Sequence, residues 1–355
     1  MTNWLVVGCG ITGAIIAERI ASSGQKVSII DKRDHVAGNV YDTKDPPIHQ
    51  YGPHVFHTNS EDVFRYLSRF TQWRQYHHRS NVAILDKQYS LPFNLNSLRA
   101  IFGMKWERAL INDYDFGSRV MLNDLLRSRK YKTIGLFVLD NIFRGYSEKQ
   151  WDRPFDSIPR SIIDRLPGIV LNYDNGYFSD KFQTMPKQGY TAMVNAILDH
   201  PNITVKLNAG FDHSMKYRNM VYTGPIDEFF GRRHGPLEYR SLLFKHELLP
   251  CGWFQEVGIV NYPNVPGYTR VIEHKHSMYA SNPKSTWITY EYPQAYTGKN
   301  EPYYPVPDEE NLARYEKYRR LVPPNVLMAG RLAQYKYFDM DQAVANALET
   351  AERIS

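Results

Sequence analysis

The chain has 355 residues, with 43 Lys and Arg against 37 Asp and Glu and a formal net charge of +6. This length suffices for about two domains with a sizeable core, and so mild a charge excludes the broad basic surface of a nucleic-acid-binding protein. Two cysteines exclude a disulfide framework and a thiolate metal site, while 26 tyrosines point to an aromatic cleft that accepts anions.

The same composition indicates the cell compartment of the protein and excludes some classes of partner. No apolar run is long enough to span a membrane, and the N-terminal residues lack the basic segment of a secretory signal. Few cysteines are typical of a reducing compartment. We therefore expect a cytoplasmic protein with no metal centre, no nucleic-acid partner and no membrane span.

The chain opens with the pattern of a βαβ unit. An apolar run at 4–7 predicts a buried parallel strand, and the motif GCGITG at 8–13 follows it directly. An amphipathic helical pattern covers 14–21, and a second apolar strand at 27–30 ends at Asp31. This context favours a dinucleotide site, because such a loop presents the N–H groups of a helix to phosphates.

Each glycine of this motif has its own task. Gly8 permits the tight turn, Gly10 lets the backbone approach a pyrophosphate, and Gly13 lets helix and strand pack closely. Asp31 is expected to accept a hydrogen bond from an adenosine ribose, which argues against a 2′-phosphate. The small-residue loop at 32–39 favours FAD, whose pyrophosphate and ribityl chain need a second covering loop.

The later segments alternate between two kinds of pattern. Helical patterns occur at roughly 60–70, 96–102, 119–128, 134–143, 158–164 and 190–199, and a last helix is expected at 342–354. Strand patterns occur at 203–206, 219–223, 286–292 and 325–330.

The predicted fold class is α/β: a Rossmann-like FAD-binding domain with an inserted helical domain and a mostly antiparallel β-sheet domain. The FAD-binding domain is expected from residues 1–60, about 201–235 and 322–355. A largely helical substrate and lid domain takes about 61–200, with a mobile loop at about 152–176, and a sheet domain takes about 236–321.

Nine segments in order resemble bacterial UDP-galactopyranose mutases over essentially the whole chain. They are YGPHVFHTN at 51–59, LPFNLNSL at 91–98, GYSEKQW at 145–151, YFSDKFQTMPKQGY at 177–190, YTGPID at 222–227, YRSLLF at 239–244, YTRVIEHK at 268–275, EPYYPV at 301–306 and GRLAQYKYFDMDQ at 330–342. The resemblance implies a non-redox isomerisation of UDP-galactopyranose to UDP-galactofuranose with reduced FAD. In this family the flavin N5 forms a covalent adduct with the sugar, the ring opens and recloses, and UDP returns.

The resemblance also implies roles for individual residues. Arg165 and Arg270 match the substrate arginines, whose guanidinium groups grip a diphosphate better than lysine does. With them, His57 is expected at the catalytic centre. The expected substrate-binding residues are Phe143, Tyr146, Ser147, Trp151, Tyr177, Tyr304, Tyr337 and His78, although plain core packing stays an alternative for Phe143 and Ser147. Of these, the resemblance places Tyr177 on the uracil and Phe143, Tyr146, Ser147 and Trp151 along the nucleoside. The expected FAD-binding residues are Gly8, Gly10, Thr12, Gly13, Asp31, Lys32, Gly38, Asn39, His54, Val55, Arg331, Asp339 and Met340.

The chain departs from the family pattern at three places. Ala37 and Ala329 stand where the family commonly has the first glycine of a pair, so an added methyl group could change how the backbone meets the flavin. The segment 165–177 is one residue longer than usual, and the arginine common after Val is absent. These departures bear on lid closure and on flavin contacts.

Two other functions fit parts of the sequence. A flavin oxidoreductase of the amine-oxidase-like type could share the nucleotide domain, but arginines and tyrosines suit a diphosphate better than an amine. A non-catalytic nucleotide-sugar binder is the other alternative. For the mutase, the resemblance implies an electron donor such as NAD(P)H, which reduces the FAD, and a homodimer.

Overall fold

The structure is a computed structural model that describes residues 2–164, 166–278 and 282–354. The chain divides into two compact units: unit 1 comprises 1–76, 180–241 and 296–355, and unit 2 comprises 77–179 and 242–295. Residues 61–76 and 180–200, expected in the helical domain, thus fall in unit 1. The stretch 236–321, expected as a separate sheet domain, is divided between the units.

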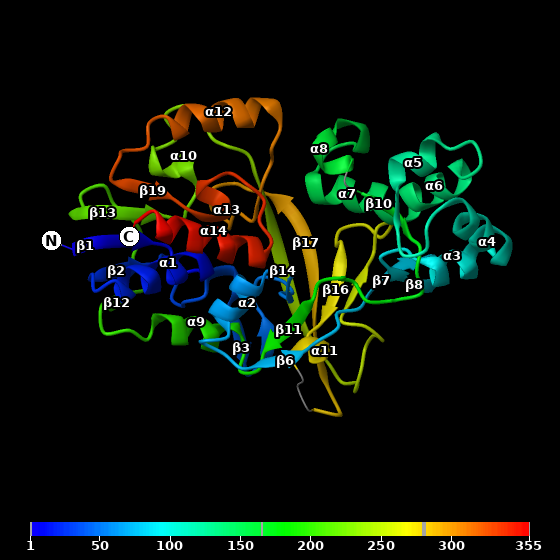
Figure 1. The fold of residues 1–355 in the computed structure, drawn as a ribbon, viewed down its shortest axis with the longest axis horizontal. Helices are drawn as coiled ribbons and strands as arrows, with labels where there is room; N and C mark the ends of the chain where they lie inside the picture. Colours follow the sequence, from blue (N-terminus) through cyan, green and yellow to red (C-terminus); the bar gives the residue numbers. More distant parts are fainter. Residues whose placement is uncertain (1, 165, 279–281, 355) are drawn as a thin grey trace. The chain divides into compact units, whose positions relative to one another are not determined.

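Unit 1 is built around a parallel sheet flanked by helices (Figure 1). Its strands are β1 (Thr2–Val7), β2 (Val27–Ile30), β3 (Asp42–Lys44), β4 (Pro47–His49), β5 (Phe56–Thr58), β6 (Trp73–Gln75), β11 (Phe182–Pro186), β12 (Ile203–Lys206), β13 (Tyr217–Tyr222), β18 (Tyr304–Pro305) and β19 (Val326–Met328). Its helices are α1 (Ile11–Ser22), α2 (Glu61–Leu67), α9 (Tyr190–Leu198), α10 (Ile226–Phe229), α12 (Glu309–Arg319), α13 (Gly330–Ala333) and α14 (Met340–Glu352), with a 3-10 turn at Gly38–Val40.

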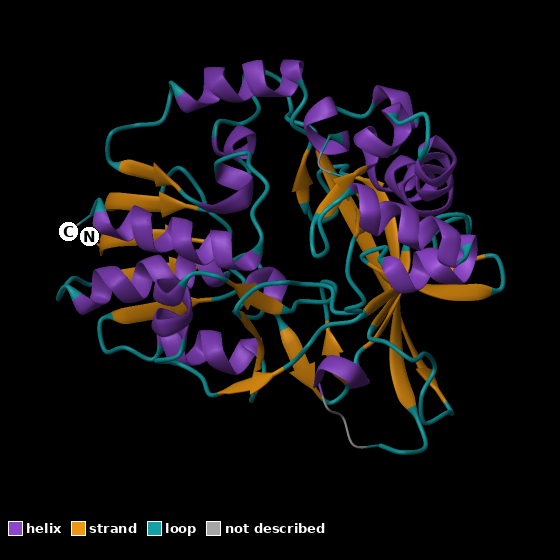
Figure 2. Cartoon of the chain, turned by 45° about the vertical axis from the view of Figure 1, so that its right-hand side comes forward, coloured by secondary structure: helices purple, strands orange, loops and turns teal. Residues whose placement is uncertain are grey.

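Unit 2 joins a mostly antiparallel sheet, in which β7 and β15 form a parallel pair, to a group of short helices (Figure 2). Its strands are β7 (Ser80–Ile84), β8 (Lys87–Leu91), β9 (Arg119–Met121), β10 (Pro167–Val170), β15 (Ile259–Asn261), β16 (Arg270–Glu273) and β17 (Thr286–Ala295), while β14 (Tyr239–Leu249) begins in unit 1 and ends here. Its helices are α3 (Leu95–Phe102), α4 (Met104–Asp113), α5 (Leu122–Arg127), α6 (Lys132–Val138), α7 (Arg144–Trp151), α8 (Arg160–Ile163) and α11 (Lys275–Met278), with a π-helix at Leu139–Phe143 and a 3-10 turn at Phe155–Ser157.

The main sheet of unit 1 has the strand order β12-β2-β1-β13-β19, and every pair in it is parallel. This is the Rossmann arrangement, in which the order reverses beside β1 and leaves a crevice at the carboxyl ends of β1 and β13. The structure therefore has the α/β architecture that the sequence predicts.

Alternating side chains of β1 explain why helices cover this sheet on both faces. Trp4 and Val6 pack into a core that contains residues of α1, α9 and α14. Leu5 belongs to a second core on the opposite face, with Met220 of β13 and Phe229 of α10. A strand with apolar side chains on both faces reads as a continuous apolar run, which is the pattern that the sequence shows at 4–7.

Two expected elements differ from the structure. The stretch 119–128 is not helical throughout, because β9 (Arg119–Met121) precedes α5 and pairs antiparallel with β10. The hairpin of β7 and β8 falls between the helical patterns at 60–70 and 96–102, inside the domain that the sequence predicts to be largely helical. β9 gains its stability from β10, and β7 pairs with the distant β15 as well as with β8; local periodicity does not report such distant partners.

None of the helices in the described ranges has the length and apolar character that crossing a bilayer requires.

His49, the last residue of β4, is expected to make the stability of the fold sensitive to acid. The side chain is 1% exposed, its ring lies 5.8 Å from that of Tyr190, and burial lowers its pKa to about 4. In the unfolded chain the His49 ring takes up a proton at a pKa near 6.5, whereas in the folded protein it stays neutral until the pH approaches 4. The contribution of neutral His49 to the free energy of unfolding is therefore complete above about pH 6.5 and is lost as the pH falls toward 4. We expect the wild type to lose about 2 kcal/mol more than His49→Gln between pH 7 and pH 5. Urea unfolding at both pH values measures this, and equal losses would contradict it.

Candidate functional site

The loop after β1 is shaped by glycines that nothing larger could replace. Gly8 has φ +102°, and a Cβ there would lie 2.0 Å from the Thr223 hydroxyl oxygen. A Cβ on Gly13 would lie 2.0 Å from the carbonyl oxygen of Gly8. The loop therefore folds tightly against α1, as the motif predicts.

The first turn of α1 is open to an anion. Gly10 occupies the N-cap position, no side chain caps the helix, and its first turn carries no acidic residue. A Cβ on Gly10 would meet only the Cα of Gly38, at 3.7 Å, so a ligand can approach this backbone closely. Uncapped N–H groups together with the helix dipole suit a pyrophosphate.

A second loop packs onto the first. A Cβ on Gly38 would lie 2.7 Å from the Cα of Gly10, and Ala37 N–H donates to the carbonyl of Cys9 at 2.9 Å. Ala37 has φ +74°, a left-handed conformation that glycine adopts without strain, whereas Ala329 has an ordinary extended φ of −132°. Of the two departures from the glycine pairs, Ala37 thus carries a backbone cost and Ala329 does not.

Asp31 organises both loops. Its carboxylate accepts hydrogen bonds from the backbone N–H of Cys9 at 2.7 Å and of Arg33 at 2.9 Å, and the residue is 8% exposed. A carboxylate has about four acceptor positions, so these two bonds leave capacity for a ribose hydroxyl.

Glu301 joins the loop at 32–39 to the segment before β18, a link that the sequence does not reveal. It pairs with Lys32 at 3.1 Å and with Arg33 at 3.0 Å, and Arg33 also donates to Asn39 at 2.9 Å. Burial alone would raise the pKa of Glu301, but the two cations outweigh it and hold the pKa low. An ionised Glu301 therefore fixes the cofactor loop to the segment that carries Tyr304.

A cation beside a pair of stacked phenol rings lies next to the glycine loops. Gly330, at the start of α13, would place a Cβ 3.3 Å from the Thr12 side chain of α1. The guanidinium of Arg331 then lies 5.4 Å from the ring of Tyr304 and 5.3 Å from that of Tyr337. The two phenol rings stack at 6.0 Å.

The neighbouring helix α14 is fixed at its first turn by Asp339. Asp339 forms a capping box with Gln342 and accepts the Tyr337 hydroxyl at 3.0 Å. Met340 is the first residue of α14, so both residues expected at the flavin lie at this helix start.

The histidine segment lies in and before β5. His57 contacts Asp180 through Nδ1 at 3.0 Å, and Asn59 holds the other oxygen of Asp180 at 2.8 Å. This carboxylate fixes the ring orientation of His57, and sequence reasoning missed it. His54 contacts the carbonyl of Gly52 at 2.8 Å, and Val55 packs partly against the unit 1 core.

In unit 2 the expected nucleoside residues are carried by one helical stretch. The π-helix at Leu139–Phe143 joins α6 to α7, and such π-turns occur often at functional sites. Tyr146, Ser147 and Trp151 lie on α7, where Ser147 is 5% exposed. Phe143 and Trp151 both pack partly against the unit 2 core, so packing accounts for part of their surface.

Tyr177 and His78 lie together in unit 2. Tyr177 N–H donates to the carbonyl of His78 at 2.8 Å, and their rings meet edge to face at 5.6 Å. His78 is 4% exposed, whereas Tyr177 is 39% exposed and can offer its ring to a base.

Arg270 at the start of β16 is held by a buried carboxylate. Its Nε and Nη2 donate to one oxygen of Glu291 at 2.9 and 2.7 Å, and Glu291 is 1% exposed. These two bonds fix the plane of the guanidinium. Arg165 lies outside the described residues.

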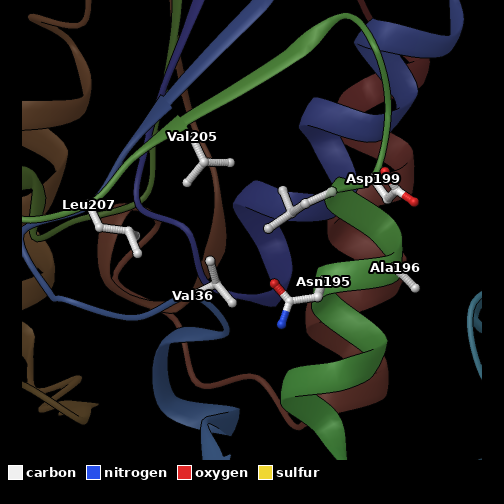
Figure 3. A pocket seen from close by; sticks show the side chains of 7 residues that line it. Val36, Asn195, Ala196, Asp199, Val205 and Leu207 are labelled. Carbon is white, nitrogen blue, oxygen red and sulfur yellow. The ribbon is translucent and has the colours of Figure 1, made fainter.

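An open hollow of unit 1 lies beside the loop at 32–39, from which it takes Val36. Figure 3 shows Val36, Asn195, Val205 and Leu207 around a space of about 580 Å³ beside α9 and β12. None of the predicted site residues lines it.

The fold and the glycine loops define a dinucleotide-binding enzyme of the Rossmann class. The model of the NAD(P)-binding Rossmann-like domain matches residues 6–70, and that of UDP-galactopyranose mutase matches 141–337. The chain is 36% identical to a probable UDP-galactopyranose mutase of Klebsiella pneumoniae, covering 99% of this chain and 94% of that protein. It is 32% identical to a dTDP-fucopyranose mutase of Escherichia coli, covering 99% and 98%.

A solved structure of a reduced UDP-galactopyranose mutase has the same fold, with a TM-score of 0.74 at 15% identity over 100% of this chain and 94% of that one. The chain belongs to the UDP-galactopyranose mutase family. The predicted family, its mutase class of enzyme and the α/β fold class are therefore confirmed.

Proposed function

We propose that this protein isomerises UDP-galactopyranose to UDP-galactofuranose with reduced FAD. The observation that carries the proposal is the Arg331–Tyr304–Tyr337 cluster, which adjoins the glycine loops through the contact of Gly330 with Thr12. A guanidinium beside phenol rings suits a diphosphate, because a guanidinium donates charge-assisted hydrogen bonds to phosphate oxygens, and the Tyr337 hydroxyl could exchange Asp339 for such an oxygen. In this cluster Arg331 is the expected FAD-binding residue and the two tyrosines are the expected substrate-binding residues, and a simple dinucleotide oxidoreductase has no need of tyrosines for a second diphosphate.

The residues of unit 1 fit FAD. The uncapped N–H groups of α1 would hold the pyrophosphate, Asp31 the ribose, and Gly38 with Asn39 would cover the cofactor. When bound in its reduced form, a flavin supplies a nucleophilic nitrogen for the anomeric carbon, as the family resemblance implies. Arg331 supports the anionic groups nearby, while the contact with Asp180 orients His57.

The residues of unit 2 fit the nucleotide part of the substrate. Tyr177 offers a ring for stacking on the base, and α7 presents Tyr146 and Ser147. Arg270, oriented by Glu291, supplies a planar guanidinium for a phosphate. Arg165 is assigned the same task on the basis of the sequence alone.

The kinship to a dTDP-fucopyranose mutase makes the sugar nucleotide the first point to test. We expect the dithionite-reduced protein to convert UDP-galactopyranose to UDP-galactofuranose, and the oxidised protein without reductant to be inactive. Chromatography of the nucleotide sugars measures both, with dTDP-fucopyranose as a competing substrate. Hydrogen peroxide formation would favour a flavin oxidoreductase, and binding of the sugar nucleotide without turnover would favour a non-catalytic nucleotide-sugar binder. Faster turnover of dTDP-fucopyranose than of UDP-galactopyranose would make the dTDP sugar the preferred substrate.

From the family resemblance we further infer an electron donor such as NAD(P)H, a homodimer and a cytoplasmic location. Size-exclusion chromatography with light scattering tests the dimer, and flavin bleaching by NADH or NADPH tests the donor.

A further inference from the structure

Lys149 lies in the last turn of α7, and its ammonium is held by the backbone of a single loop. Its Nζ donates to the carbonyl oxygens of Tyr262 at 2.6 Å, Val265 at 2.7 Å and Tyr268 at 2.7 Å. An ammonium has three N–H donors, so these carbonyls match its full capacity. Burial lowers the pKa of Lys149 to about 8, which still leaves the charged form dominant at neutral pH.

Gly145 touches the same loop one helical turn earlier. A Cβ on Gly145 would lie 2.5 Å from the carbonyl oxygen of Pro263 and 3.1 Å from Oδ1 of Asn264. Residues four apart lie on one face of a helix, so Gly145 and Lys149 present the same face to the loop. Two separate features, a close backbone approach and a caged cation, therefore fix α7 against residues 262–269.

This loop leads directly to the substrate arginine. It connects β15 to β16 and is closed by the hydrogen bond from Tyr262 N–H to the carbonyl of Thr269, at 2.8 Å. Arg270 is the next residue along the chain. The helix on one side of the contact thus carries the expected nucleoside residues Tyr146 and Ser147, and the loop on the other side leads into β16, which begins with Arg270.

We propose that Lys149 is a positioning residue that couples nucleoside recognition by α7 to phosphate recognition by Arg270. The proposal rests on the proposed function, because it takes a nucleoside diphosphate as the ligand. Three carbonyls held at one cation fix where β16 begins, so Arg270 keeps a constant place relative to α7. Without the ammonium the carbonyls turn toward water, and the loop loses this fixed register.

The coupling predicts a loss confined to ligands that reach both parts of the site. Uridine would contact only the nucleoside residues, whereas UDP also reaches the arginine. In Lys149→Met we expect UDP to bind about tenfold more weakly or worse, and uridine to bind within about twofold of the wild type. The KM for the sugar nucleotide should rise by a larger factor than kcat falls.

The experiment uses the FAD-loaded protein and titrates uridine and UDP by NMR and calorimetry. Gly145→Ala disturbs the same contact without changing a charge and should give the same selective loss. Lys130→Met is the matched control, because it removes an exposed ammonium that pairs with Asp113 at 2.7 Å elsewhere in unit 2. Its affinities should stay unchanged.

Several outcomes separate the two proposals. Lys149 does not couple nucleoside and phosphate recognition if both variants fold and bind UDP like the wild type. The same conclusion holds if the affinities for uridine and for UDP fall by the same factor. If the wild type itself binds no UDP, the proposed function fails instead. We expect that added guanidinium or ammonium salts restore UDP affinity in neither variant, because the variants lack a fixed geometry that a free cation does not supply. Full restoration of UDP affinity by such a salt would also overturn the coupling.

Discussion

Replacing Arg270 by lysine is expected to lower the turnover of UDP-galactopyranose by roughly one to three orders of magnitude, at about 1.4 kcal/mol for each tenfold. The guanidinium uses Nε and Nη2 to hold Glu291, so its plane has a fixed direction. Lysine has one nitrogen for both tasks and cannot present a planar pair of donors to a phosphate. The substitution would also leave the buried Glu291 without its two-donor partner, and breaking such a buried pair is costly.

Steady-state kinetics with the reduced protein measures this loss. Arg108→Lys is a suitable control, because Arg108 is an exposed residue of α4 in the same unit. Its turnover should match the wild type, while both variants should keep the flavin spectrum and the melting temperature. Turnover near the wild-type value in Arg270→Lys would remove Arg270 from the site.

The sequence predicts best those features whose residues lie close together along the chain. The strand, the glycine loop and the start of α1 fall within a few residues, so the motif alone specifies the turn at Gly8 and the open helix terminus at Gly10. The nine motif segments identify the family for the same reason: each is a local string.

The sequence alone does not predict contacts between side chains that lie on strands distant along the chain. Glu291 meets Arg270 because β16 and β17 pair in one particular register, and a shift by one residue would turn Glu291 to the other face. Asp180 meets His57 just outside the pairing of β5 with β11. Local patterns fix neither the partner nor the register, although a charged residue inside an apolar strand pattern, such as Glu291, is a signal that it has a buried partner.

Gly13→Ala is expected to damage the fold itself, with a loss of about 3 kcal/mol in the free energy of unfolding. The new Cβ would lie 2.0 Å from the carbonyl oxygen of Gly8 and 3.2 Å from a methyl group of Val6. Backbone on one side and a core strand on the other leave no flexible group that could move aside. Urea unfolding of the apoprotein measures this effect without any cofactor.

Gly10→Ala is the matched variant, and we expect it to weaken flavin binding while leaving the stability of the apoprotein nearly unchanged. Gly10 has φ −75°, and its added Cβ would meet only the Cα of Gly38, at 3.7 Å, so the apoprotein should stay within about 1 kcal/mol of the wild type. The methyl group would instead occupy space that a pyrophosphate needs, and flavin affinity should fall at least tenfold in a fluorescence titration. Wild-type flavin affinity in Gly10→Ala would show that the pyrophosphate does not lie at this helix terminus. Equal destabilisation of both apoproteins would show that the two glycines serve packing alone.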